Sequence, residues 1–369
     1  MGERMKKVIF LLNQFRYSNG VARALIGLCN NMDLTQFDIT VKPIYVLDKD
    51  LAKELDPRIK VEKAFGFYFK GFDKLAHLIP TKVLYDQFVG GDYDIEVAFQ
   101  CGLPTKIVGY SKNKKAVHAI WMHGFEMYSE EFLRADKVLC VSKYNAERCK
   151  EILGEIVNVD YCYNLVEDSF IKSASKEPIK FKQTENPLLV SVGRLSPEKG
   201  YLRLVKILRE LRDEGVRFNL LLVGDGPEHQ KISDTVNSLQ MNDWIELVGY
   251  QVNPHKYTAK SDLFICSSFS EGYSTACTEA AILGIPIITT CVAGGEEIIA
   301  DCECGLLTNM DDESLKKSIR EAITNPELLK SWKNTMRRTS QKFCLEARKA
   351  RVNTFFEEFV ELSNERIKE

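Results

Sequence analysis

Two glutamates separated by seven residues, Glu271 and Glu279, have the spacing in this chain that most strongly indicates chemistry. They flank the start of a helix-like run over 275–283, which follows a strand-like run over 262–267. A Gly-Ile-Pro sequence at 284–286 is expected to end that helix. Carboxylates accept hydrogen bonds from sugar hydroxyls, and the free N–H groups of a helix N-terminus favour phosphate. The pattern therefore indicates a ligand that combines a sugar, a diphosphate and a ribose, as a nucleotide-sugar does.

The composition is typical of a globular protein in a reducing compartment. A chain of 369 residues is too long for one ordinary core and suits two domains. The hydrophobic content of 45% and the charged content of 28% are ordinary, and the net charge of -2 argues against a nucleic-acid partner. The eleven cysteines are scattered without a Cys-x-x-Cys pair, which favours reduced thiols and a cytoplasmic protein.

The N-terminus and the hydropathy pattern predict neither a signal peptide nor a spanning helix. The charged residues 1–7 lead straight into a strand-like run over 8–12. No apolar run approaches the ~20 residues that a membrane-spanning helix needs.

The two halves of the chain begin alike, each with a strand, a polar loop that contains glycine, and an amphipathic helix. These segments are 7–12, 13–20 and 21–30 in the first half, and 188–192, 193–200 and 201–211 in the second. Further short apolar runs read as buried strands at 95–99, 116–122, 137–141, 220–223, 245–248, 263–266 and 287–290. Short apolar runs that alternate with helix patterns argue for parallel sheets, so the chain is predicted to form two doubly wound α/β domains.

The join between the domains is expected near 164–185, where periodicity fades. This gives a first domain over 1–165 and a second over 166–344. The charged amphipathic segment 345–369 is predicted to be a helix that packs back on the first domain. Because ligands bind beyond the carboxyl ends of strands in open α/β sheets, a cleft between two facing sheets is the expected active site.

Several motifs resemble those of retaining glycosyltransferase family 4. Residues 191–200 resemble its GRL-x-x-EKG signature and 223–227 its VGDGP turn. Residues 271–279 resemble its E-x7-E motif and 284–286 the G-x-P that follows. Looser matches occur at 19–23, 121–124 and 164–166. The resemblance implies a GT-B fold: two facing Rossmann-like domains with parallel sheets and an interdomain cleft, and a last helix that crosses back to the first domain.

The resemblance also implies roles for residues of the second domain. Gly193, Arg194 and Lys199 lie in one loop and are assigned to binding of the nucleotide-sugar donor. Arg194 and Lys199 are placed at its diphosphate, where cations stabilise the charge of a leaving group. Glu271 is assigned to the donor sugar near its 3-hydroxyl, and Glu279 to the ribose hydroxyls. Backbone N–H groups for the sugar and phosphate would come from Gly272, Tyr273, Ser274 and Thr275. Taken singly, each of these charges also suits a surface loop or helix.

In the first domain, the resemblance places His123 at a strand end, near the donor sugar and the reacting centre. His118 lies inside the same run and is interpreted as structural. Asn19 and Gly20 could place backbone N–H groups near the β-phosphate. Arg23 is either a further phosphate ligand or an exposed helix residue.

No metal ion or cofactor is predicted. Asp92 and Asp94 form a D-x-D sequence, but a turn at the entry of strand 95–99 explains them. No complete G-x-G-x-x-G or Walker A sequence occurs, which makes a nicotinamide or P-loop site a weak alternative. The remaining histidines, His77, His229 and His255, show no ligand spacing with the cysteines.

Residues 64–89 mix aromatic side chains with lysines. This composition suits the headgroup layer of a membrane, and equally the packing of two helices beneath a sheet. The expected location is the cytoplasm, at the inner face of the membrane if this segment makes that contact.

The resemblance implies transfer of a sugar from a nucleoside-diphosphate sugar to a hydroxyl of a glycan or lipid-linked acceptor. UDP is the most common nucleotide in such donors, and the configuration at the anomeric carbon is expected to be retained. It also implies a role in bacterial surface-polysaccharide assembly. Two alternatives are a non-catalytic nucleotide-sugar-binding subunit of a transferase pair, and another GT-B enzyme such as a sugar-nucleotide epimerase or a phosphorylase.

Overall fold

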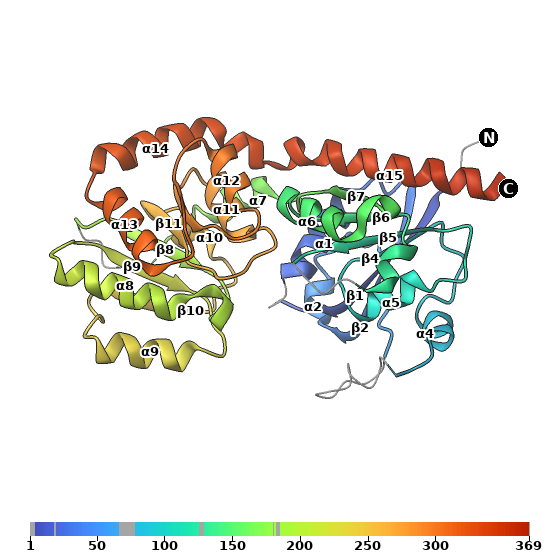
Figure 1. Cartoon of the computed structure of the whole chain (residues 1–369), viewed down its shortest axis with the longest axis horizontal. Coiled ribbons are helices and arrows are strands. Elements are labelled where there is room, and N and C mark those ends of the chain that lie inside the picture. Colours follow the sequence, from blue (N-terminus) through green and yellow to red (C-terminus); the bar gives the residue numbers. More distant parts are fainter. Residues whose placement is uncertain are drawn as a thin grey trace. The chain divides into compact units, whose positions relative to one another are not determined.

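The computed structural model describes residues 4–17, 20–65, 78–124, 129–179, 181 and 185–368. The chain divides into two compact units. Unit 1 comprises 1–165 and 348–369, and unit 2 comprises 166–347. In each unit a parallel sheet is covered by helices (Figure 1).

The sheet of unit 1 has seven strands in the order β3-β2-β1-β4-β5-β6-β7 among the described residues. The order reverses between β1 and β4, and all the pairs are parallel. The strands are β1 (Lys6–Phe15), β2 (Phe37–Leu47), β3 (Lys60–Val61), β4 (Ile95–Ala98), β5 (Val117–Met122), β6 (Lys137–Cys140) and β7 (Asn158–Tyr161). The helices around them are α1 (Gly20–Asn31), α2 (Lys49–Ala52), α4 (Thr81–Phe88), α5 (Leu103–Gly109) and α6 (Lys143–Leu153), with 3₁₀ turns at Glu130–Arg134 and Gly154–Ile156. The central strands are buried on both faces, as expected for an all-parallel sheet.

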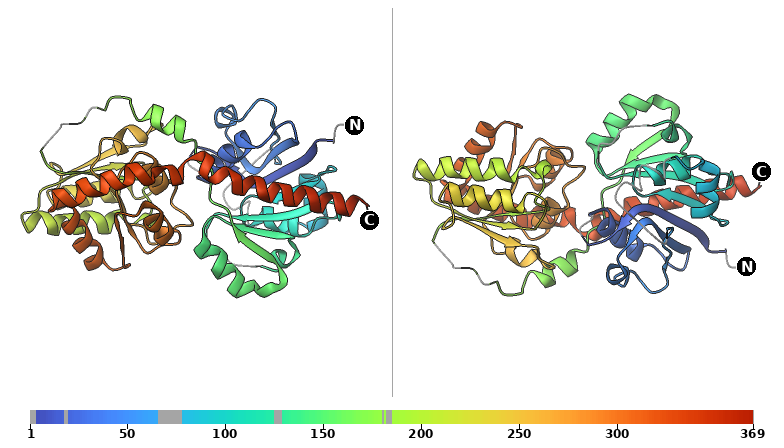
Figure 2. Two further views of the ribbon diagram at one scale, coloured as in Figure 1. Left: turned by 90° about the horizontal axis from the view of Figure 1, so that it is seen from above. Right: turned by 90° about the horizontal axis from the view of Figure 1, so that it is seen from below.

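The last helix, α15 (Leu345–Lys368), packs along unit 1 through residues 348–368 (Figure 2). Its Phe356 ring lies 6.3 Å from that of Phe10 and 5.5 Å from that of Phe37. Arg366 forms an ion pair with Asp136, just before β6. Apolar packing and charge pairing therefore both hold this helix on the first sheet.

The sheet of unit 2 has six strands in the order β10-β9-β8-β11-β12-β13 among the described residues, and again all the pairs are parallel. The order reverses between β8 and β11. The strands are β8 (Leu188–Val192), β9 (Asn219–Val223), β10 (Ile245–Gly249), β11 (Leu263–Cys266), β12 (Ile287–Thr290) and β13 (Leu306–Thr308). The helices are α7 (Asp168–Ala174), α8 (Tyr201–Asp213), α9 (His229–Ser238), α10 (His255–Thr258), α11 (Thr275–Ile282), α12 (Gly295–Cys302), α13 (Asp312–Ile323) and α14 (Pro326–Thr339), with 3₁₀ turns at Pro197–Lys199 and Ser340–Phe343.

One local expectation was wrong. The first strand was expected to end at Leu12, but β1 continues to Phe15 because a register shift between Leu12 and Gln14 lets it follow β2 further. The stretch 164–185 contains α7, which is too short, at seven residues, to show helical periodicity. The expected end of α11 is confirmed, because Gly284 has the left-handed φ of +76° that typically ends a helix.

Part of segment 64–89 belongs to the core of unit 1. Phe88 is fully buried and its ring lies 4.5 Å from that of Phe65, while the hydroxyl of Tyr85 donates to the buried carboxylate of Glu96 at 2.7 Å. These three aromatic residues therefore pack inside the unit and do not face a membrane. Residues 66–77 lie outside the described residues. Across the part of the chain that is described, no helix is both long and apolar enough to cross a membrane.

Candidate active site

The loops that follow β8 and β11 lie side by side at the carboxyl edge of the second sheet, because these strands are neighbours at the point where the strand order reverses. Ligands of open α/β sheets bind at this position. Lys199 ends a 3₁₀ turn in the loop after β8, and Glu271 lies in the loop between β11 and α11.

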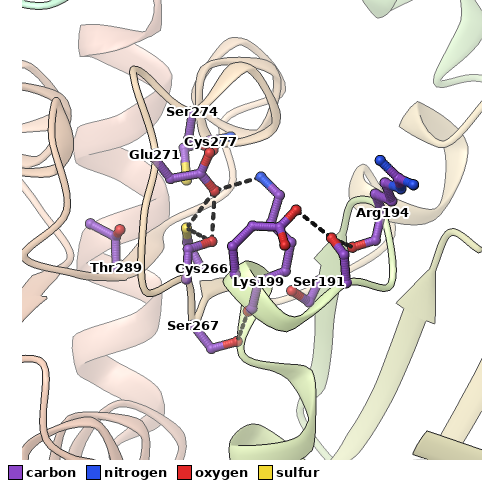
Figure 3. Close-up of polar contacts among 12 residues, drawn as sticks. Ser191, Arg194, Lys199, Cys266, Ser267, Glu271, Ser274, Cys277 and Thr289 are labelled. Carbon is purple, nitrogen blue, oxygen red and sulfur yellow. Dashed lines mark hydrogen bonds and ion pairs between the residues drawn. The ribbon is translucent and has the colours of Figure 1, made fainter. Parts of the chain in front are cut away.

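Lys199 and Glu271 form an ion pair, with Lys199 Nζ 2.7 Å from Glu271 Oε1 (Figure 3). The hydroxyl of Ser268 donates to the same oxygen at 2.6 Å. Within the described residues, Glu271 Oε2 makes no hydrogen bond, so one carboxylate oxygen is fixed and the other remains able to accept. Burial by itself lowers the pKa of Lys199, but the nearby Glu271 carboxylate outweighs burial and raises the pKa above its ordinary value. Lys199 is therefore a cation at neutral pH.

Backbone contacts hold the two loops together. The hydroxyl of Ser267 donates to the carbonyl of Lys199 at 2.9 Å, and the N–H of Phe269 donates to the carbonyl of Glu198 at 2.7 Å. Gly200 has a φ of +68°, and a Cβ there would lie 2.2 Å from the carbonyl oxygen of Ser267. Only glycine allows this close approach.

Gly193 lies where the loop after β8 meets the loop after β9, which begins at Gly224. A Cβ at this position would lie 2.7 Å from the hydroxyl oxygen of Tyr201, and a Cβ on Gly224 would lie 1.9 Å from the Gly193 carbonyl oxygen. Gly224 is thus required by the packing of one loop against the other, and Gly193 by its approach to the first side chain of α8. A direct contact of Gly193 with a ligand stays a prediction.

The N-terminus of α11 points its first N–H groups into the same region. Ser274 caps the helix, because its hydroxyl accepts from the N–H of Cys277 at 3.3 Å. Thr275 begins the helix, and its N–H has no intrahelical acceptor. The Tyr273 side chain is buried and packs near Gly294, so its side chain is not available to a ligand, and the backbone role of Gly272 and Tyr273 stays a prediction.

Glu279 lies one turn into α11 and is partly exposed. Its Oε2 lies 3.7 Å from Nδ1 of His255, a buried residue of α10. His255 showed no signal in the sequence, because its partner lies 24 residues further along the chain and on another helix.

Arg194 differs from Lys199 although both occur in one motif. Its side chain is exposed, and Figure 3 shows its guanidinium directed away from the Lys199–Glu271 pair. The two cations therefore share a loop but do not converge in this conformation.

In unit 1, His123 follows β5, with its ring 4.5 Å from that of Phe99. Burial lowers the pKa of His123 to about 3, so the imidazole is neutral at physiological pH. Its Nε2 is buried and has no hydrogen-bond partner in the described residues.

The other residues predicted in unit 1 differ in their surroundings. Gly20 is exposed and begins α1, whereas Asn19 lies outside the described residues. Arg23 forms an ion pair with Glu54, which supports the interpretation as a helix-surface residue. His118, in β5, has its Nε2 3.6 Å from Oε2 of the buried Glu96 and, among the described residues, makes no hydrogen bond or ion pair with a predicted site residue.

The D-x-D sequence has a structural role. Asp94 accepts a hydrogen bond from the N–H of Lys7 at 2.8 Å, and Lys6 Nζ lies 3.9 Å from its carboxylate. The residue before β4 is therefore bonded to the first residues of β1. Across the described ranges, no group of three or more histidine, cysteine or acidic side chains is arranged to hold a metal ion.

Two further residues support this site without any signal in the sequence: Ser268, which fixes one oxygen of Glu271, and Arg203, which binds the backbone of the same loop. Serine occurs at 267, 268 and 270, and no local signal tells which hydroxyl reaches the carboxylate. At the carboxyl edge of the second sheet lie a partly buried cation, a carboxylate with one oxygen able to accept, helix N–H donors and a second carboxylate. This set can bind an anion and a polyol side by side.

Several known proteins are similar to this chain. Residues 173–339 match the family described as Glycosyl transferases group 1. The chain is 26% identical over 213 residues to the N-acetylgalactosamine-N,N'-diacetylbacillosaminyl-diphospho-undecaprenol 4-alpha-N-acetylgalactosaminyltransferase of Campylobacter jejuni, an alignment that covers 57% of each protein. It is 24% identical over 361 residues to an uncharacterized glycosyltransferase of Haemophilus influenzae, which covers 93% of this chain and 97% of that protein.

Solved structures share the fold over the whole length. Sucrose-phosphate synthase of Thermosynechococcus elongatus has a TM-score of 0.76 at 15% identity, covering 96% of this chain and 99% of that one. HepE of Anabaena, solved in complex with UDP and glucose, has a TM-score of 0.71 at 17% identity, covering 96% of this chain and all (100%) of that one. The two parallel sheets and the solved structures therefore show a GT-B fold, and residues 173–339 within it are similar to the Glycosyl transferases group 1 family.

Proposed function

We propose that this chain is a retaining, metal-independent glycosyltransferase that moves a sugar from a nucleoside-diphosphate sugar to a hydroxyl of a glycan or lipid-linked acceptor. The observation that carries the proposal is the Lys199–Glu271 pair beside the N-terminus of α11, at the switch point of the second sheet. A UDP-sugar is the favoured donor. This choice is supported by HepE, which has a similar fold and was solved with UDP and glucose. A lipid-linked acceptor is supported by the Campylobacter relative, whose name includes a diphospho-undecaprenol substrate.

The proposed chemistry is electrostatic. As the bond between the anomeric carbon and the phosphate oxygen breaks, negative charge gathers on the leaving diphosphate. Lys199, and Arg194 after rotation of its exposed side chain, together with the N–H groups at the start of α11, stabilise that charge. The acceptor oxygen attacks on the same face, and its proton passes to the leaving phosphate, so no protein nucleophile is needed. Glu271 binds a hydroxyl of the donor sugar through Oε2, and Glu279 binds the ribose hydroxyls.

Residues of unit 1 are assigned to the acceptor side and to the donor sugar. His123 is neutral at physiological pH because burial lowers its pKa, so it would act as a hydrogen-bonding group and not as a cation. Gly20, at the exposed start of α1, would bring backbone N–H groups to the β-phosphate. Asn19 keeps the same predicted role.

Contact of segment 64–89 with the cytoplasmic face of a membrane is part of the proposal. Within its described residues, Leu78 and Val83 are 78% and 52% exposed, and Lys82 lies beside them at the start of α4. A flotation assay with vesicles of anionic and of zwitterionic lipids tests this, with Leu78→Ser/Val83→Ser as the variant. Equal flotation of the wild type and the variant would count against the contact.

The donor is tested by thermal unfolding with UDP-, GDP-, ADP- and dTDP-sugars. A ligand at 100 times its dissociation constant adds about 2.7 kcal/mol to the free energy of unfolding. The selected donor is then incubated with chelator and a glycan or lipid-linked acceptor, and the anomeric configuration of the product is read by NMR. Stabilisation by none of the four donors would refute the proposal, an inverted product would remove retention, and loss of transfer in chelator would remove metal independence.

A further inference from the structure

Arg203 is a buried cation next to the candidate site that contacts backbone and not the proposed ligand positions. It lies in the first turn of α8, four residues after Lys199, and is only 7% exposed. All of its hydrogen bonds go to carbonyl oxygens. Nε and Nη2 donate to the carbonyl of Ser267 at 3.1 and 2.7 Å, Nη2 also reaches that of Ser268 at 3.4 Å, and Nη1 donates to that of Met310 at 2.7 Å.

These carbonyls belong to two different loops of the second sheet. Ser267 and Ser268 begin the loop that carries Glu271, while Met310 lies between β13 and α13. One side chain therefore ties the first turn of α8, which follows Lys199 directly, to the loop of Glu271 and to a third segment. The hydroxyl of Thr290, at the end of β12, supports the same loop by donating to the carbonyl of Ser268 at 2.6 Å.

The surroundings of Arg203 keep its guanidinium in one place. The ring of Phe269 covers it at 4.0 Å, and the Asp312 carboxylate lies 3.8 Å from Nη1. A planar guanidinium binds several acceptors in fixed directions, which a lysine cannot do. A buried charge is tolerated only when it is bonded in this way, and its removal leaves carbonyls without donors.

We propose that Arg203 is a positioning residue for sugar transfer, which holds the loop of Glu271 in place against Lys199. Its effect on transfer rests on the proposed function, whereas its effect on the loop does not. A displacement of about 1 Å in a group that acts on the transition state can cost about 10²-fold in rate. Arg203 acts on rate through Glu271 and makes no contact with the donor itself.

Arg212 provides a matched control on the same helix. It also donates to backbone carbonyls, with Nη1 3.3 Å from the carbonyl oxygen of Leu239 and 2.6 Å from that of Gln240. These residues follow α9, outside the loops of Lys199 and Glu271. Arg203→Gln and Arg212→Gln therefore both remove guanidinium bonds to backbone carbonyls, at the two ends of α8, and only the first touches the candidate site. Arg212→Gln also removes bonds to the Asp213 carboxylate.

The first measurement is hydrogen exchange of the full chain. Arg203→Gln is expected to raise amide exchange by about tenfold or more over 267–275, which corresponds to about 1.4 kcal/mol of lost local stability. Arg212→Gln is expected to raise exchange near 237–246 and to leave 267–275 unchanged. Unchanged exchange over 267–275 in Arg203→Gln would overturn the positioning role, whatever the donor is.

The second measurement is steady-state transfer with the donor selected by the panel. In Arg203→Gln, kcat and kcat/KM are expected to fall together by about 10–100-fold with little change in the KM for the donor, because the lost interaction acts on the transition state. Arg203→Lys, which keeps the charge and one donor group, is expected to recover part of kcat and also serves if Arg203→Gln does not fold.

Equal kcat values in Arg203→Gln and Arg212→Gln would overturn the link to transfer. A wild-type chain that acts on no nucleotide-sugar would count against the proposed function, and hydrogen exchange would then decide the role of Arg203 alone.

Discussion

Lys199 Nζ lies 2.7 Å from Glu271 Oε1, so the cation and the carboxylate that are proposed to bind opposite parts of the donor bind each other. The two residues are 72 positions apart in the chain and meet because β8 and β11 are neighbouring strands. A diphosphate that reaches Lys199 must share the ammonium group with Glu271. Each of the two residues therefore sets the position of the other, and both must be changed separately to tell their roles apart.

Removal of Lys199 is expected to slow transfer strongly. Lys199→Ala should lower kcat by about 10²–10³-fold, because the charge on the leaving diphosphate loses a preorganised cation. The control is Lys206→Ala, which removes an exposed lysine of the following helix α8 and should leave kcat unchanged. Wild-type turnover in Lys199→Ala would contradict a role for this residue in catalysis.

Neutralising Glu271 is expected to change the pH dependence of transfer. In the wild type, the carboxylate raises the pKa of Lys199 against the opposing effect of burial. In Glu271→Gln, burial remains and the carboxylate charge is gone, so the pKa of Lys199 falls and the cation is lost at lower pH. The alkaline limb of the kcat profile should therefore move to lower pH, which a series of rates up to pH 10 would measure. A limb at the wild-type position would show that Lys199 does not control it.

Glu279 is expected to recognise the ribose. A hydrogen bond to a charged group contributes about 1.5–3 kcal/mol, so the wild type should bind the selected nucleoside diphosphate roughly 10–100-fold more tightly than its 2′,3′-dideoxy analogue. Glu279→Ala should bind both ligands with nearly equal affinity, as measured by calorimetry. Glu321→Ala, on the exposed face of α13, should keep the full difference. If Glu279→Ala also keeps it, the hydroxyls are bound by another residue.

Gly200 is expected to be the most sensitive glycine of the site loop. Gly200 and Gly215 both have a left-handed φ, of +68° and +84°, but only at Gly200 would a Cβ meet a backbone atom, at 2.2 Å. Gly215→Ala should cost about 1–2 kcal/mol of unfolding free energy from backbone strain alone. Gly200→Ala should cost clearly more, because the loop of Ser267 must also shift. Urea unfolding of both variants checks this, and equal losses would contradict the close approach.

The burial of His123 predicts a loss of stability at acidic pH. Its pKa is about 3 in the folded chain and about 6.5 when exposed, so below pH 6.5 protons bind preferentially to the unfolded state. The contribution of His123 to the free energy of unfolding is fully present above pH 6.5, and it falls by about 1–2 kcal/mol between pH 7 and pH 5. His123→Gln should remove that part of the slope in urea unfolding. His229→Gln removes a partly exposed histidine whose Nδ1 lies 2.8 Å from Oδ1 of Asp225, and this variant should retain the slope.

The comparison of Arg194 with Lys199 shows where prediction from the sequence stops. Both are cations of one motif, and nothing in their types or spacing separates them. In the structure, Lys199 is mostly buried and paired with Glu271, while Arg194 is exposed and directed away. The difference arises from the neighbouring loop, whose place depends on strand order and therefore on contacts far along the chain.

The sequence by itself determined the local features of this protein: the alternation of short buried strands with amphipathic helices, the start and end of α11, and the glycines at its loops. These features follow from periodicity and backbone conformation, which are properties of a few neighbouring residues. Only the tertiary structure decided that Ser268 fixes Glu271, that His255 lies beside Glu279, and that Arg203 ties the loops together. The physical reason is that parallel sheets bring together strand ends that are distant in sequence, and the partner of each polar group is chosen by that assembly.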